Sequence, residues 1–218
     1  MHTRNRNLVL AFLAASCLLA LAAEVAAADS GGYIGIAAGQ SRAKVDRGGI
    51  DAIFTASSLT ASTTIDETGT AFKIYGGYQI SQNIAIEGGY SDLGKSKFHS
   101  IVTSGGSGTG DGEWKAYSID ISALGILPLG DQFSLFGRAG LGIWNLDFKF
   151  TASGPGGTGT VSESESGVSP LLGIGATFNF TPQFSLRGEI ERHFSVGKDD
   201  TTGKSDIDLI TLGLQYRF

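Results

Sequence analysis

Hydrophobic and polar side chains alternate along most of the chain, most regularly near its C-terminal end. In the ten residues LITLGLQYRF, the apolar face consists of Ile210, Leu212, Leu214, Tyr216 and Phe218. The opposite face becomes polar toward the end of the stretch. A repeat of two is typical of a β-strand, because successive side chains of a strand point to opposite sides.

The same alternation predicts eight strands. Their approximate bounds are Gly32–Arg42, Thr68–Ile80, Asn83–Leu93, Glu113–Leu127, Gln132–Phe150, Val168–Phe180, Gln183–Phe194 and Asp206–Phe218. An even number of antiparallel strands is what closed bacterial barrels contain.

The predicted connections alternate between short and long. Short turns are expected at Ile80–Asn83, Leu127–Gln132 and Phe180–Gln183. Long loops are expected at Ala43–Glu67, Gly94–Gly112, Thr151–Gly167 and Ser195–Ser205. This asymmetry is typical of outer-membrane barrels, whose short turns lie in the periplasm.

The two faces of the predicted strands differ in chemistry. One face is apolar, whereas the other carries mid-strand charges such as Arg138, Arg187, Glu189 and Glu191. A soluble sandwich or barrel would turn the apolar face inward, and a membrane barrel would turn it toward lipid. Aromatic residues near strand ends, glycines within strands and the asymmetry of the loops favour the membrane arrangement. We therefore predict an all-β fold, an eight-stranded antiparallel transmembrane β-barrel.

The first residues predict export. Two arginines precede an apolar run that ends at Ala23, and a small-residue stretch with an A-x-A pattern ends at Ala28. We expect residues 1–28 to be a cleaved signal peptide and residues 29–218 to form one outer-membrane barrel domain of a Gram-negative cell envelope. Cys17 lies within the signal, so the mature chain would contain no cysteine; lipid attachment at Cys17 is the alternative.

Composition excludes several classes of function. The formal net charge is −5 without a basic patch, which argues against nucleic-acid binding. The stretch GSGTGDG lacks the strand–helix context and the Lys–Ser/Thr of a phosphate-binding loop. His2, His99 and His193 are too scattered in sequence to predict a metal site. We therefore expect no cofactor, no metal ligand and no catalytic residue.

The interior of an eight-stranded barrel is nearly filled by side chains. The charged residues expected there include Glu87, Arg138, Arg187 and Glu189. Because unpaired charges at this depth are costly, we expect these four to form a structural lumen salt-bridge network. A second possibility is that rearrangement of the pairs opens a narrow, porin-like path for ions.

Several segments resemble the transmembrane domain of the OmpA-like outer-membrane proteins. They are IYGGYQISQNIAIEGGYSDLGK (Ile74–Lys95), DQFSLFGRAGLGIWNLD (Asp131–Asp147) and GVSPLLGIGATFNFTPQFSLRGEIERHF (Gly167–Phe194), with LGLQYRF at the end. The resemblance implies an eight-stranded barrel with four surface loops and an internal salt-bridge network. Glu87, Arg138, Arg187 and Glu189 match its network positions.

The resemblance also implies how the barrel is inserted. Barrels of this family end in an alternating segment with a final Phe, which the barrel-assembly machinery recognises. In this chain that signal would comprise Leu212, Leu214, Tyr216 and Phe218.

The chain departs from the family pattern in its expected lumen. The fourth predicted strand offers Ser122 to Leu124 where the family tends to place a lysine, and Thr177 stands where a carboxylate is usual. These departures argue against a family-style gate. We also expect no peptidoglycan-binding domain after the barrel.

One enzymatic alternative rests on the stretch HFS. His193 and Ser195 resemble the His-x-Ser element of outer-membrane lipid A deacylases, with Asp206 or Asp208 in place of the expected Glu. Val196 stands where that family has Asn. The strand period predicts that His193 and Ser195 both point inward, away from lipid, so we expect no enzyme.

The expected partners follow from the predicted location. They are outer-membrane lipid and lipopolysaccharide, the barrel-assembly machinery and an extracellular ligand or phage at the loops. The loops TSGGSGTGDG and TASGPGGTGTVSESES are rich in Ser, Thr and Gly, which predicts flexible exposed backbone. Solvated filler without a ligand is the alternative for these loops.

Overall fold

The computed structural model describes residues 30–43, 60–104, 107–198 and 204–218. The expected signal peptide, residues 1–28, lies outside the described residues and stays a prediction. The strands are β1 (Gly31–Ala43), β2 (Thr60–Asp66), β3 (Thr68–Ser81), β4 (Ile84–Ser104), β5 (Thr109–Pro128), β6 (Phe133–Gly154), β7 (Gly157–Asn179), β8 (Phe184–Val196) and β9 (Ser205–Arg217). No helix in this part of the chain is long and apolar enough to cross a bilayer.

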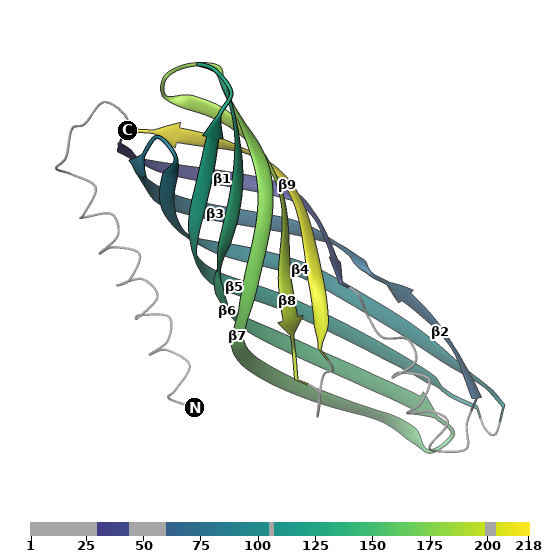
Figure 1. Ribbon diagram of the computed structural model, residues 1–218. Helices are drawn as coiled ribbons and strands as arrows, with labels where there is room; N and C mark the ends of the chain where they lie inside the picture. Colours follow the sequence, from purple (N-terminus) through teal and green to yellow (C-terminus); the bar gives the residue numbers. More distant parts are fainter. Residues whose placement is uncertain (1–29, 44–59, 105–106, 199–203) are drawn as a thin grey trace.

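Eight of these strands form a closed ring. Each pairs antiparallel with its neighbours in the order β1, β3, β4, β5, β6, β7, β8, β9, and the ring closes where β9 pairs with β1, for example Leu214 opposite Ile36 (Figure 1). Closure pairs the backbone groups of the wall, as a strand structure in hydrocarbon requires. The predicted eight-stranded antiparallel barrel is therefore confirmed.

A ninth strand lies in the segment expected to be the first long loop. One residue separates β2 from β3, and β2 pairs with the distal part of β4, from Thr60 opposite Ser104 to Asp66 opposite Lys97. β3 pairs with the proximal part of the same strand. β2 and β3 therefore pair with successive parts of β4, and β2 lies outside the closed ring.

Two further predicted loops are wrong. Gly94–Gly112 and Thr151–Gly167 are largely strand, so that β4, β5, β6 and β7 have 21, 20, 22 and 23 residues. The β6–β7 ladder continues to Gly154 opposite Gly157, with a two-residue turn at Pro155 and Gly156. The periodicity argument missed these parts because they are rich in Gly, Ser and Thr, which weakens the alternation, although the backbones still pair.

The extra length carries the sheet beyond the membrane. A transmembrane strand needs about 9–11 residues, roughly half the length of β7. We call the extension the projecting sheet. It comprises β2 and residues 95–104, 109–116, 146–154 and 157–167 of β4 to β7, and it extends to the lower right in Figure 1.

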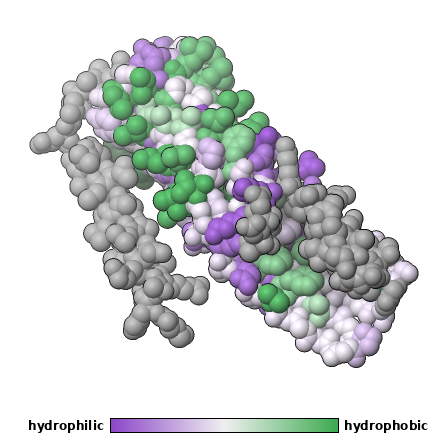
Figure 2. Space-filling model, turned by 60° about the horizontal axis from the view of Figure 1, so that its bottom comes forward, coloured by the Kyte–Doolittle hydropathy of each residue, from purple (hydrophilic) through white to green (hydrophobic). Residues whose placement is uncertain are grey.

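The ring turns its apolar side chains outward. Ile121 and Ile174 are each 66% exposed and Leu212 is 59% exposed, as are residues at matching positions on the other strands. On the face seen in Figure 2, hydrophobic residues gather toward the end that holds the short turns, and hydrophilic residues lie over the middle. Exposed apolar area of this extent is the lipid-facing band of an outer-membrane barrel.

Candidate functional site: the barrel lumen and the projecting sheet

β8 places a row of ionisable side chains inside the barrel. Arg187, Glu189, Glu191 and His193 lie at alternate positions, and all four are at most 5% exposed. The alternation arises because β8 is a regular strand up to His193, where a bulge begins against β9. The inward face of one strand thus supplies four of the eight buried Asp, Glu, Lys, Arg and His side chains of the described residues.

The structure brings the four residues of the expected lumen network together. Arg187 Nη1 lies 2.6 Å from Glu87 Oε2, and Arg187 Nη2 lies 3.1 Å from Glu189 Oε2. Arg138 Nη1 lies 3.0 Å from Glu189 Oε1 and 3.3 Å from Glu87 Oε1. The two guanidinium groups therefore bridge the same two carboxylates.

Two further residues complete the network. Lys73 of β3 contacts Glu191 at 2.7 Å and Glu189 at 3.4 Å, and Arg138 contacts Glu191 at 2.7 Å. Both Lys73 and Glu191 lie on the polar face of their predicted strands, so alternation alone could have included them. Lys73 supplies a lumen lysine from a strand other than the one where the family tends to place it.

Aromatic rings pack against the network on the side of the short turns. The guanidinium carbon of Arg187 lies 4.2 Å from the ring centre of Phe136 and 4.6 Å from that of Tyr75. The hydroxyl of Tyr33 donates to Glu87 at 3.1 Å. A guanidinium group between two ring faces gains cation–π attraction in addition to its ion pairs.

Apolar side chains lie on both sides of the polar layer. The lower cluster, toward the short turns, contains Tyr33, Ala37, Tyr75, Ala85, Leu124 and Phe136. The upper cluster contains Ala71, Leu93, Ala116, Trp144, Leu146, Val196, Ile207 and Leu209. The interior is therefore layered as apolar, charged and apolar along the barrel axis.

The residues of the deacylase alternative do not form a triad. His193 points inward and its Nε2 lies 2.7 Å from Glu191 Oε1, but Ser195 is exposed with a left-handed φ of 53°. The expectation that Ser195 points inward is wrong, because the bulge between His193 and Val196 breaks the alternation. The backbone N–H of Ser195 donates to Asp206, and Asp208 pairs with Arg192.

The projecting sheet carries different chemistry on its two faces. Its inner face, continuous with the lumen, presents an aromatic cluster of Phe98, Trp114, Phe148 and Phe150, with ring centres 5.4 to 5.9 Å apart. Its outer face carries ion pairs, including Lys95 with Glu113 at 2.8 Å and His99 with Asp111 at 2.6 Å. Unlike the ion pairs of the lumen, these pairs are exposed to solvent.

One edge of the projecting sheet is unpaired within the described part of the chain. β8 pairs with β7 only from Leu171 onward, while residues 157–164 of β7 pair with β6 alone among the described strands. The side chains from Gly157 to Ser164 are all exposed. An edge of this kind presents free N–H and C=O groups to a partner strand.

The residues of the expected assembly signal lie on the outer face of β9. Leu212, Leu214, Tyr216 and Phe218 are exposed, and Phe218 is 68% exposed. Tyr216 packs against Phe184 and Phe218 with ring centres 5.1 and 5.4 Å apart. These rings form an aromatic row at the short-turn end, as in the interfacial girdles of membrane barrels.

A closed antiparallel ring with an apolar exterior and a charged, buried interior defines an outer-membrane β-barrel. Comparison with known proteins gives the family. The family model of the OmpA-like transmembrane domain matches residues 27–218 of the sequence. The chain therefore belongs to this family and resides in the outer membrane.

Relatives of known name support the same assignment. The chain is 30% identical over 145 residues to outer membrane protein A of Salmonella typhi and to that of Shigella flexneri, which covers 66% of this chain and 39% of each relative. The matched region therefore spans about two fifths of the relatives' length.

Solved structures show the same fold. The attachment invasion locus protein Ail of Yersinia pestis, crystallised with the heparin analogue sucrose octasulfate, matches with a TM-score of 0.50 and 22% identity, covering 87% of this chain and 99% of Ail. Neisserial surface protein A matches with a TM-score of 0.55 and 15% identity over the same shares.

Proposed function

We propose that this outer-membrane barrel has a structural and surface-interaction role, with the projecting sheet as its contact surface. The observation that carries the proposal is the length of β4 to β7, which continue well past the lipid-facing band. The open edge of β7 can pair with a strand of a partner through backbone hydrogen bonds. Alternate side chains along β7 can then give specificity for the sequence of that strand. We expect this sheet to lie outside the cell, because the short turns of such barrels lie in the periplasm.

We propose further that the lumen does not conduct ions. Support comes from the two apolar clusters that lie above and below the ion pairs, and from side chains such as Lys73 and Glu87 that are at most 2% exposed. A continuous path would have to break several buried ion pairs at once. Planar-bilayer recordings of the purified barrel should be silent, and single-channel steps would contradict this part of the proposal.

The proposed role involves no catalysis. Support comes from the separation of Ser195, on the exposed surface, from His193, which points inward. Cells that carry Ser195→Ala should therefore retain the acylation pattern of their lipid A by mass spectrometry. A change in that pattern would restore the deacylase alternative.

The partner is expected outside the cell. Ail was crystallised with a heparin analogue, so a barrel with this fold can present a ligand surface. In this chain both heparin-like polyanions and extended polypeptides are candidates, since the outer face offers Lys95, Lys97 and Lys149 among acidic neighbours and β7 offers a free edge. Phages that adsorb to the cell surface are a further candidate.

Shortening the β6–β7 hairpin tests the surface role. Replacing residues 149–162 with Asn-Gly removes six ladder positions from each strand, and it keeps Phe148 opposite Glu163. Asn-Gly suits the two-residue turn that the shortened hairpin needs. We expect adhesion to heparin or extracellular-matrix surfaces, or adsorption of phage, to fall to the level of cells without the protein.

A matched control keeps the full hairpin. Replacing only Pro155 with Asn gives the same Asn-Gly turn with the native Gly156 and does not shorten the ladder, so it should leave adhesion unchanged. Heat-modifiable migration on gels should be normal for both variants, because the barrel wall is intact. If the shortened variant adheres as well as the control, the surface role of this hairpin is wrong.

We propose that the exposed aromatic row at the end of β9 serves barrel assembly. In Phe218→Ala the ring that packs on Tyr216 is lost, while the lumen contacts are untouched. Less folded protein should reach the outer membrane of living cells, whereas refolding into detergent should be nearly unchanged. An Ile101→Ala variant on the projecting sheet serves as control, and equal loss in both assays would point to simple instability of Phe218→Ala.

A further inference from the structure

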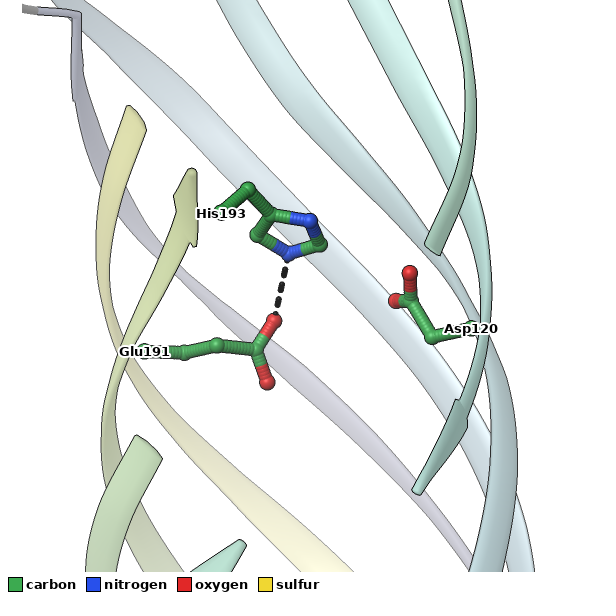
Figure 3. Close-up of side chains that lie close together, drawn as sticks. All are labelled: Asp120, Glu191 and His193. Atoms are coloured by element: carbon green, nitrogen blue, oxygen red, sulfur yellow. Dashed lines mark hydrogen bonds and ion pairs between the residues drawn. The ribbon is translucent and has the colours of Figure 1, made fainter. Parts of the chain in front are cut away.

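Three ionisable side chains meet at the upper end of the polar layer. Asp120 extends inward from β5, while Glu191 and His193 extend from β8 on the other side of the lumen (Figure 3). One ligand atom from each lies within 4.8 Å of the others, and all three residues are at most 3% exposed. The proposed surface role makes no use of this cluster.

The hydrogen bonds assign the protonation pattern of His193. Its Nε2 lies 2.7 Å from Glu191 Oε1, and Glu191 also contacts Lys73 and Arg138 at 2.7 Å each. A carboxylate held by two cations accepts hydrogen bonds, so the ring donates its proton from Nε2. The lone pair of a neutral imidazole then resides on Nδ1, which is buried and has no partner among the described residues.

Asp120 is a carboxylate without a cationic partner in the described part of the chain. Its two oxygens accept hydrogen bonds from the hydroxyls of Ser118 at 2.5 Å and Ser91 at 2.8 Å. These bonds fix the orientation of the carboxylate, but they supply no positive charge. An uncompensated carboxylate in a buried site is costly.

The buried charges do not balance. The described interior contains three cations and four carboxylates beside His193: Lys73, Arg138 and Arg187, and Glu87, Asp120, Glu189 and Glu191. With a neutral imidazole, one negative charge remains. We assign it to Asp120, because the other three carboxylates have ion pairs with Lys or Arg. A positive charge bound beside Asp120 and His193 Nδ1 would compensate it.

Gly142 of β6 lets the polar atoms converge. A methyl group on Gly142 would lie 2.4 Å from Ser118 Oγ, 2.6 Å from Asp120 Oδ1 and 3.4 Å from His193 Nδ1. Its strand partner Ser169 is 1% exposed, and its hydroxyl also has no partner in the described residues. Oxygen and nitrogen atoms that can bind a metal therefore surround the Cβ position of Gly142, and the glycine leaves this position empty of a side chain.

We propose that this cluster is a binding site for a divalent transition-metal ion such as Zn²⁺. His193 Nδ1 and the Asp120 carboxylate are the ligands, and hydroxyls or water complete the coordination. Glu191 is a positioning residue, because it holds the imidazole through Nε2–H, as carboxylates do behind many metal-bound histidines. One nitrogen and carboxylate oxygens suit a metal of borderline softness better than Ca²⁺ or Mg²⁺. The metal would join β5 to β8 across the lumen.

The test uses the full barrel extracted from outer membranes in detergent. The protein is stripped with EDTA, given ZnCl₂ and desalted, and its metal content is measured by inductively coupled plasma mass spectrometry. We expect one zinc per chain in the wild type, and none retained in Asp120→Asn or His193→Gln. Glu191→Gln should weaken binding by about 10–100-fold, the usual effect of losing such a positioning residue. Gly142→Ala should also weaken it, because its methyl group displaces Asp120 and Ser118.

A surface histidine is the matched control. His99 pairs with Asp111 at 2.6 Å on the projecting sheet but is 47% exposed at its side chain. His99→Gln should retain the full zinc content. Heat-modifiable migration checks that each variant is folded. Added zinc should raise the thermal stability of the wild type and of His99→Gln, but not that of Asp120→Asn or His193→Gln, because a ligand of the folded state stabilises it.

Two outcomes would overturn the proposal. Equal zinc in the wild type, Asp120→Asn and His193→Gln would show adventitious surface binding. Absence of retained zinc in the folded wild type would show that the cluster does not bind the metal. Neither outcome affects the proposed surface role, which is measured by adhesion of the hairpin variants.

Discussion

The lumen and the projecting sheet contain ion pairs of nearly the same length in opposite environments. Arg138 and Glu191 lie 2.7 Å apart with side chains 0% and 2% exposed. Lys95 and Glu113 lie 2.8 Å apart with side chains 45% and 38% exposed. The distance between the charged atoms therefore does not distinguish the two pairs, and burial must decide what each contributes.

The difference teaches why the lumen charges form a network. Water screens Lys95 and Glu113, so each tolerates the loss of the other. A buried guanidinium or carboxylate is not solvated by water, so it needs oppositely charged partners within the protein. This explains why Arg138 and Arg187 each contact two or three carboxylates in the lumen.

The largest effect is expected from breaking a lumen pair. Arg187→Ala removes both ion pairs of this guanidinium. Of the two arginines paired with Glu87, only Arg138 is left, at 3.3 Å. We expect a loss of about 3–5 kcal/mol in the free energy of unfolding, the usual cost of leaving a buried charge without its partner. Urea-induced unfolding in detergent, followed by gel migration and tryptophan fluorescence, measures it.

A double variant separates the charge effect from lost packing. Glu87→Gln combined with Arg187→Gln removes both charges and keeps side chains of intermediate length. It should be more stable than Arg187→Ala, because removing one charge of each sign does not increase the excess of buried carboxylates. Equal destabilisation in both variants would show that the stacking of Arg187 on Phe136 and Tyr75 dominates instead.

The smallest effect is expected from the exposed pair. Lys95→Ala should cost only about 0–1 kcal/mol at neutral pH, as is usual for surface ion pairs. The hydrogen bond from Lys95 holds the pKa of Glu113 below its ordinary value of 4.5. A carboxyl with a lowered folded-state pKa stabilises the protein above its unfolded-state pKa, and this contribution is lost as the pH falls through the folded-state value.

The pH dependence sharpens the comparison further. The small difference between wild type and Lys95→Ala should be present at neutral pH and vanish in acid, after Glu113 is protonated. Urea midpoints of the two proteins at several pH values measure it, and added salt should reduce the difference at neutral pH. A cost as large as that of Arg187→Ala would show that the projecting sheet is not exposed to water as described.

Much of the barrel could be read from the alternation of side chains. Because a strand turns successive residues to opposite faces, the pattern placed Leu212 and Ile174 on the lipid side and Arg187 and Glu189 inside. The lengths of β4 to β7 could not be read in this way. Their distal parts are held by backbone hydrogen bonds between Ser-, Thr- and Gly-rich segments, and such bonds leave little periodic signal in the sequence.

The candidate metal site could also be predicted from the sequence only in part. That Glu191 and His193 share a face with Arg187 follows from counting residues along β8, until the bulge redirects Ser195. That Asp120 lies beside His193 does not follow from counting, because β5 and β8 are separated by two strands in the ring. Separation along the chain made the three histidines unpromising as metal ligands, but one histidine and two carboxylates meet in space.

The sequence by itself determined the compartment, the strand class and the face on which each residue of the regular strands lies, since these depend on local order. The tertiary structure decided which inward-facing charges become partners, how far the sheet continues past the membrane and where the alternation breaks. Those features depend on closure of the ring, which sets the register of each strand against its neighbours and brings distant walls of the lumen into contact.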